Sequence, residues 1–289
     1  MKSSKLVITS LFFICAVTAC NKSDNINAIN KTSSQSNAVS ASVCDRFAYP
    51  DTIFYPKKST QDYIVMPLHV QTGKYGSFPD GLKIDGNSGA IKVNKSETGL
   101  KYIVWFIPEG TRDTCKKFLT ISGINYRDSI FTVGGNRSSV SIPVYNANTQ
   151  TPIVCNGGGC EFGKELIAQG IAVNQADGTI DLKQSVLNGA LGTNPRNGAF
   201  KDFVMNYRIS DKSQQALNSI SFRLYYYKLR SQIPDSLINI LNQKQSQVLE
   251  GDDDDPDDHD LTFSSLGITS KNGEAEVKCR PPYIIVTQR

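Results

Sequence analysis

Residues 81–99 read GLKIDGNSGAIKVNKSETG, and the expected fold follows from their pattern. This stretch joins alternating apolar residues, a turn of small and polar residues, a second glycine and a further alternating pair. Alternation with a period of two predicts β-strands, and the Gly/Asn-rich centre predicts the turn of a hairpin. The same skeleton returns 89 residues later as GIAVNQADGTIDLKQS (residues 170–185). The sequence therefore predicts one hairpin used twice.

A second echo follows each hairpin. The segment KFLTI (117–121) matches ISFRL (220–224) at an offset of 103 residues. The change from 89 to 103 places about 14 inserted residues between the two markers, where the Gly/Asn-rich segment 186–202 lies. Two matches in the same order indicate one structural unit that occurs twice.

The remaining pattern is one of short strands separated by turn signals. The run YIVWFI (102–107) is apolar on both alternating faces, which predicts a central strand with Trp105 in the core. One helix is expected from Pro234 to near Leu249, because proline is favoured in the first turn and apolar residues recur on one face. The predicted fold class is all-β, with two tandem β-sandwich domains and one short helix in the second. We place the domains at 43–148 and 149–289, with an acidic loop at 251–260 in the second.

The N-terminal segment 1–42 carries targeting signals rather than a fold. A basic start and an apolar run over 6–17 are typical of a signal peptide, and the run is shorter than the ~20 residues of a spanning helix. The run ends in AVTAC (16–20), which resembles a bacterial lipobox. That resemblance implies removal of 1–19, acylation of Cys20 and, with Asn21 following, an outer-membrane location whose leaflet stays open. Residues 20–42 are too polar to fold and predict a flexible tether.

The hairpin residues also carry a family resemblance. FPDGLKID (78–85), followed by the glycine, tyrosine and valine of GLKYIV (99–104), resembles the cadherin-like and putative-Ig repeats of bacterial surface proteins. Residues 170–185 match more weakly, with Asn174 in place of Asp85. The resemblance implies Ig/cadherin-like sandwiches, and the whole layout is similar to two-domain lipoproteins of Bacteroidota. The calcium motifs of true cadherins are absent from the sequence.

Five cysteines follow the tether, and an exported protein meets an oxidising compartment that allows disulfides. We predict the pairs Cys44–Cys115 and Cys155–Cys160, which leaves Cys279 unpaired. A zinc site is the alternative, and the lack of a nearby histidine or a CxxC spacing disfavours it.

The charge is unevenly distributed. The formal net charge of +4 falls to +2 without Lys2 and Lys5, and the mature chain outside the seven aspartates of 252–260 carries about +9. Such a basic body suits acidic glycans or lipid headgroups, with an ordinary soluble surface as the alternative. Nucleic acid is not expected as a partner outside the cytoplasm. The aspartates supply weak calcium candidates, and their spacing favours a solvated loop instead; these candidates are Asp252, Asp254, Asp257 and Asp260.

The sequence lacks the marks of common enzyme classes. It has two histidines, no HExxH or GxSxG motif, and a P-loop-like segment with Glu165 where Mg²⁺ needs Ser or Thr. We therefore predict no catalytic residues and no cofactor. The expected function is that of a lipid-anchored, non-enzymatic envelope protein in adhesion or scaffolding, with a glycan or surface protein as partner. A glycan-binding accessory lipoprotein of a polysaccharide-uptake system is the alternative.

Binding residues are expected where the two copies differ, namely at 155–160, 186–202 and 252–260. The tyrosines 225–227 are expected to pack in the core rather than to stack on a sugar.

Overall fold

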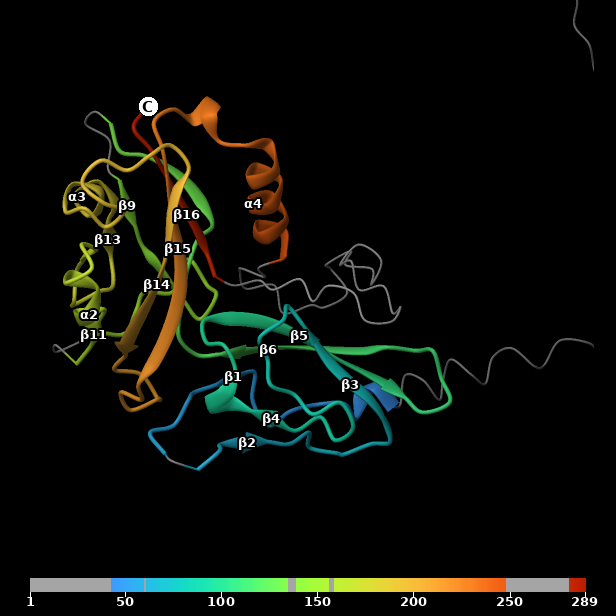
Figure 1. Ribbon diagram of the computed structural model, residues 1–289. Coiled ribbons are helices and arrows are strands. Elements are labelled where there is room, and N and C mark those ends of the chain that lie inside the picture. The colour runs from blue at the N-terminus through green and yellow to red at the C-terminus, as the bar shows by residue number, and fades with distance from the viewer. Residues whose placement is uncertain (1–42, 60, 135–138, 156–158, 248–280) are drawn as a thin grey trace, which may run out of the picture.

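The computed structural model describes residues 43–59, 61–134, 139–155, 159–247 and 281–289 (Figure 1). Within these ranges the chain is mostly β, as predicted, and it packs around two main hydrophobic cores. We call residues 43–122 the first unit and the described residues from 123 onward the second unit. The predicted signal peptide, tether, acidic loop and calcium candidates lie outside the described residues, as do Cys20 and Cys279.

The first unit is built on a sheet in the order β1-β6-β5-β3, with the predicted central strand β5 as its longest member. Alternate side chains of β5 point into the core, and a small pair, β2-β4, contributes Val65 and Ile91 to the same core. Trp105 departs from its expected core position: it is half-buried on the other face of β5, against Gly76. The bounds are β1 Ile53–Phe54, β2 Ile64–Val65, β3 Gly73–Phe78, β4 Ile91–Lys92, η1 Val93–Lys95, β5 Leu100–Pro108 and β6 Cys115–Ile121.

The second unit has a five-stranded sheet in the order β11-β14-β15-β16-β8 and a three-stranded sheet in the order β12-β13-β9. A further antiparallel pair, β7-β10, belongs to the second unit as well. The strand bounds are β7 Ile124–Tyr126, β8 Ser129–Thr132, β9 Val140–Ser141, β10 Pro143–Tyr145, β11 Glu161–Phe162, β12 Ala172–Val173, β13 Ile180–Asp181, β14 Ala199–Arg208, β15 Asn218–Tyr227 and β16 Tyr283–Thr287. The helices are α2 Lys164–Ile167, α3 Leu182–Leu187, η3 Arg230–Gln232 and α4 Asp235–Gln247.

The two predicted hairpins have the same hydrogen bonds. The Asp85 N–H donates to the Ala90 carbonyl at 2.8 Å, and the Asn174 N–H donates to the Thr179 carbonyl at 2.8 Å. After each hairpin a serine hydroxyl donates back to the chain, from Ser96 to the Lys92 carbonyl at 2.9 Å and from Ser185 to the Asp181 carbonyl at 2.6 Å. All of these pairs are related by the same offset that the sequence repeat predicted.

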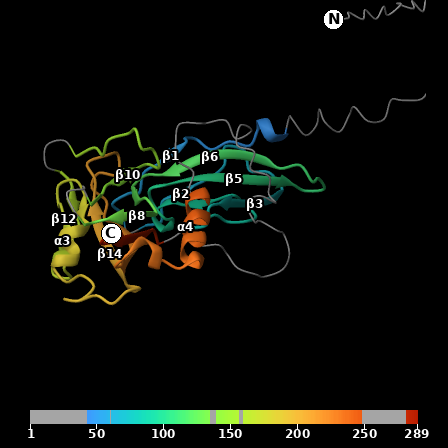
Figure 2. The same cartoon turned by 90° about the horizontal axis from the view of Figure 1, so that it is seen from above.

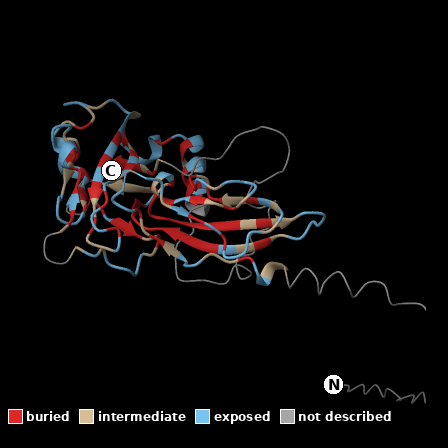
Figure 3. Ribbon diagram, turned by 90° about the horizontal axis from the view of Figure 1, so that it is seen from below, coloured by how far each residue is buried: buried red, intermediate tan, exposed pale blue. Residues whose placement is uncertain are grey.

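The strands beside the hairpins correspond as well. Leu119 of β6 lies opposite Tyr102 of β5, and Phe222 of β15 lies opposite Phe203 of β14. Leu119 and Phe222 are related by the predicted offset of the second echo, and both are buried in the core of their unit. Figure 3 shows that buried residues concentrate on the long strands. The two halves therefore share a hairpin and the strand pair beside it.

The packing does not follow the predicted boundary at residue 148. Strands β8 and β9, expected in the first domain, pair with β16 and β13 of the second unit. Ile124, Tyr126 and Tyr145 likewise lie in the second core. The second unit therefore begins near residue 123, where the chain leaves the first sheet. Seen from above, β5 and β3 extend away from the strands of the second unit (Figure 2).

The helices differ in part from the prediction. Helix α4 occurs where it was expected, and its residues Leu237 and Leu241 pack against Tyr225 and Ile285. Helix α3 begins at Leu182, which we expected to end a strand. The Asp181 side chain accepts a hydrogen bond from the Gln184 N–H at 2.8 Å and so caps the helix start. The short helix α2 was also not predicted.

Candidate functional site at the junction of the two units

A buried tyrosine joins the two units. Tyr207 of β14 places its hydroxyl 2.5 Å from Oγ1 of Thr98 in the first unit. The same hydroxyl accepts a hydrogen bond from the Ile124 N–H at 3.2 Å. Gly123 lies against it with φ +152°, and a Cβ at this position would collide with the Tyr207 hydroxyl. Glycine therefore lets the connection pass this close to the Tyr207 hydroxyl.

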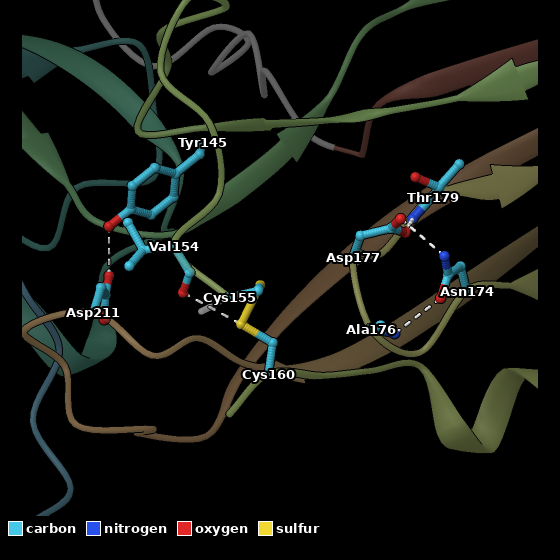
Figure 4. Close-up of a disulfide and its surroundings, with 9 residues drawn as sticks. All are labelled: Tyr145, Val154, Cys155, Cys160, Asn174, Ala176, Asp177, Thr179 and Asp211. Carbon is cyan, nitrogen blue, oxygen red and sulfur yellow. Dashed lines mark hydrogen bonds between the residues drawn. A yellow bond between two sulfur atoms is a disulfide. The ribbon is translucent and has the colours of Figure 1, made fainter. Parts of the chain in front are cut away.

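A carboxylate makes a second link. Oδ2 of Asp211 accepts a hydrogen bond from the Ser122 hydroxyl at 2.7 Å. It also accepts one from the Tyr145 hydroxyl at 2.8 Å, which Figure 4 shows. Its Oδ1 accepts from the Ser213 N–H at 2.8 Å. Burial raises the pKa of Tyr145, so this hydroxyl stays protonated and remains a donor to the carboxylate. Ser122 is the last residue of the first unit, and Asp211 belongs to the second unit. The Asp211 side chain therefore links the two units.

A groove lies at this junction, and both units line it. It encloses about 450 Å³ between the segment after β1, the turn after β4, and the ends of β14 and β15. Its cationic side chains are Lys57, Lys58 and Arg208, and no acidic residue is among those that line it. The remaining lining residues are Pro56, Ser59, Asn94, Ala216, Leu217 and Asn218.

The groove's polar groups are held by local contacts. The Asn94 side chain accepts from the Lys57 N–H at 2.9 Å and donates to the Lys57 carbonyl at 3.0 Å, which fixes the lysine backbone. The Lys57 ammonium lies 3.8 Å from the ring centre of Tyr63, an arrangement that favours the cation. Arg208 donates through Nη1 to the Gln215 carbonyl at 2.7 Å.

Arg208 also has an acidic neighbour. Its Nε lies 3.7 Å from a carboxylate oxygen of Glu161, whose side chain is 79% exposed. An ion pair with so exposed a partner is weak, so it leaves most of the guanidinium's attraction available to a ligand.

A smaller cavity of about 200 Å³ continues the groove past Arg208 and Leu217. It is lined by Cys160, Glu165 and Asn206 among others, so one end of the predicted glycine turn borders this site. Exposed Leu217 separates the two hollows. The combined surface offers cations, amides and apolar side chains, and the smaller cavity adds the carboxylates of Glu161 and Glu165.

The structure contains both cysteine pairs of the sequence analysis. Cys44 is joined to Cys115 and ties the start of the first unit to β6. Cys155 is joined to Cys160, a sequence separation of 5 residues (Figure 4). In the described ranges, no group of three or more His, Cys, Asp or Glu is placed so that it could hold a metal ion.

Other predicted positions lie away from the groove. Tyr225, Tyr226 and Tyr227 are buried, and two of them pack under α4, so they form no exposed platform. The segment 186–202 contributes nothing to the groove. It contributes Val186 and Leu187 to a separate cavity beside Arg289.

Sequence reasoning missed the cations of the groove. Lys57 and Lys58 follow the short strand β1, and Arg208 ends β14 in the other half of the chain, so no local motif connects them. The positive charge of the body was the only signal in the sequence, and it did not locate the surface.

A second exposed feature lies on the first unit. The apolar side chains of Ile64, Met66, Leu68 and Val70 are 42–58% exposed, while Val65 and Pro67 between them are buried. We call these four side chains the apolar row. No helix in the described part of the chain is both long and apolar enough to cross a membrane.

No protein-family model matches this chain, and no curated protein is significantly similar to it.

Proposed function

We propose that this chain is a lipid-anchored, non-enzymatic protein of the cell envelope, in adhesion or as a scaffold, which holds its partner in the junction groove. The observation that carries the proposal is that both units contribute cations to one groove. The links through Tyr207 and Asp211 support it, because they hold the two walls in a fixed relation. A preorganised surface binds more tightly than one that must be ordered during binding.

The groove also favours the glycan-binding alternative. Lys57, Lys58 and Arg208 attract anions, and the amides of Asn94 and Asn218 beside them suit hydroxyl groups. A polymer that carries carboxylates and hydroxyls, such as an acidic polysaccharide, matches this set. The partner we propose is therefore an acidic glycan of a cell surface or matrix.

Removing the groove's three cations tests this assignment. The triple variant Lys57→Ala, Lys58→Ala, Arg208→Ala is expected to bind polygalacturonate about tenfold more weakly, since each exposed charge contact contributes about 0.5 kcal/mol. Calorimetric titration of the soluble chain measures the loss, and binding by the wild type should weaken as salt rises.

The chain offers a matched control with the same loss of charge. Lys183, Lys228 and Arg196 are all exposed and lie outside the groove. Their triple alanine variant should bind as the wild type does. Equal weakening of both triple variants would mean that net charge, and not this groove, holds the polymer.

The anchor is tested separately. Cys20→Ser is expected to abolish incorporation of labelled fatty acid and to move the protein from the membrane fraction to the soluble fraction, because its acyl chains would be the only anchor. Cys279→Ser should leave both unchanged. Retention of Cys20→Ser in washed membranes would contradict the proposed anchor.

A further inference from the structure

Strand β16 occupies a place that belongs to a different strand in the first unit. There, β1 lies parallel to β6, with Phe54 opposite Ile121. In the second unit β16 lies parallel to β15, with Ile284 opposite Leu224. Ile121 and Leu224 are equivalent positions of the second echo, so Ile284 stands where Phe54 stands.

The backbone bonds agree. The Thr120 N–H donates to the Thr52 carbonyl at 2.7 Å, and the equivalent Arg223 N–H donates to the Pro282 carbonyl at 2.8 Å. Both Phe54 and Ile284 are buried in the core of their unit. The last described strand therefore fills the position of a unit's first strand.

The second unit has a first strand of its own, and it is displaced. Strand β9 pairs with β13 as β2 pairs with β4, with Val140 opposite Asp181 and Ile64 opposite Lys92. Strand β8 starts at residue 129 and β9 at residue 140, while β1 starts at residue 53 and β2 at residue 64. The spacing along the chain is the same in both units. By sequence β8 is thus the counterpart of β1, yet it lies one place further out and pairs with β16 instead of β15.

The position between β15 and β8, which we call the slot, is a complete strand-binding site. Its occupant pairs in parallel with β15 through residues 283–287 and with β8 through 284–287. Ile284, Ile285 and Val286 are fully buried, the first and third in the main core and Ile285 beneath α4. Backbone pairing gives affinity in such a site, and alternating side-chain contacts give specificity.

The connection to β16 differs from that to β1. The chain between β1 and β2 is short, so β1 is bound closely to its own unit. The segment 248–282, between the end of α4 and the start of β16, spans roughly 115 Å when fully extended. A strand on a connection of this length reaches a neighbouring molecule while α4 keeps its place.

We propose that the slot also accepts β16 of a second copy of this chain, so that copies join by strand exchange. The strand makes the same contacts within one molecule and between two molecules. The equilibrium between single and strand-exchanged molecules therefore depends on local concentration. Two copies held on one membrane would meet at high local concentration. This proposal does not depend on the junction groove or its ligand.

The experiment uses the full chain carrying Cys20→Ser, which keeps it in solution. The variant Ile284→Asp, Val286→Asp cannot bury its own strand, because two unpaired carboxylates would enter the core. The probe is a fluorescent peptide of residues 281–289, and the control peptide carries the same two aspartates. We expect the probe to bind the variant at least tenfold more tightly than the control peptide does, and to bind the wild type, whose slot is filled, much less.

A second measurement tests the proposal if the variant does not fold. In that case the probe peptide, added during refolding, should restore the wild-type circular dichroism spectrum, and the control peptide should not. Two differently tagged wild-type chains, refolded together at high concentration, should also co-purify. A variant that neither binds the peptide nor recovers its fold with it, together with tagged chains that never co-purify, would overturn the proposal.

Discussion

Replacing both Cys44 and Cys115 by alanine is expected to lower the free energy of unfolding by about 4 kcal/mol. The two cysteines are 71 residues apart, so the disulfide closes a large loop of the unfolded chain. In the chain-entropy account a larger loop gives the greater restriction of the unfolded state. The pair also anchors the segment that brings Phe47 into the first core. Urea unfolding of the soluble chain measures the change.

The second disulfide is the matched control. Cys155 and Cys160 are only 5 residues apart, and the same account gives about 2 kcal/mol for their removal. The first unit should lose more stability from its disulfide than the second loses from its own. Equal losses, or a larger one for Cys155→Ala with Cys160→Ala, would contradict this reasoning.

Alanine at either hairpin glycine is expected to cost about 3 kcal/mol, the sum of two effects. Gly89 and Gly178 have φ of +72° and +76°, where an L side chain is strained by about 1 kcal/mol. A Cβ on Gly89 would also overlap the ring of Tyr75, and one on Gly178 the ring of Phe162. Such overpacking typically adds about 2 kcal/mol. If the hairpins are copies, Gly89→Ala and Gly178→Ala should have similar costs in thermal unfolding.

Two other glycines distinguish backbone strain from overlap of a Cβ with a neighbouring ring. Gly110 and Gly192 also have positive φ, +77° and +92°, and a Cβ on either would meet nothing within 4 Å. Gly110→Ala and Gly192→Ala should therefore cost only about 1 kcal/mol. A loss as large as that of the hairpin variants would show that backbone strain, not ring contact, governs all four positions.

Local patterns made the duplicated hairpin predictable. The glycines, the polar turn and the serine of each copy act within a single hairpin and the turn that follows it, and these short-range bonds form in both units. The second echo likewise predicted equivalent strands. The Ig/cadherin-like family resemblance stays a prediction.

The predicted domain boundary differs from the packing because the repeat does not have one offset. Strands β1 and β2 correspond to β8 and β9 at a smaller offset than the one that relates the two hairpins. The additional residues lie between β9 and the second hairpin, a stretch that contains the Cys155–Cys160 disulfide. Because of these residues, the offset of the hairpin repeat does not identify β8 and β9 as the first strands of the second unit. The sequence pattern therefore places them in the first domain. The position of β16 depends on parallel pairing between distant segments, for which no local signal exists.

The groove was beyond sequence reasoning for a related reason. Lys57 and Arg208 belong to different units but line one groove, and Tyr207 and Asp211 link these units by hydrogen bonds. Neither link has a sequence signature, since Tyr207 meets a partner 109 residues away and Asp211 one that is 89 residues away.

Hydrogen–deuterium exchange of the soluble chain with polygalacturonate tests the proposed binding role most directly, with dextran as the neutral control. We expect slower exchange at residues 56–59 and 207–218 with the acidic polymer, and no change with dextran. Unchanged exchange at both segments, or protection confined to the apolar row at 64–70, would contradict the assignment of the junction groove as the binding site.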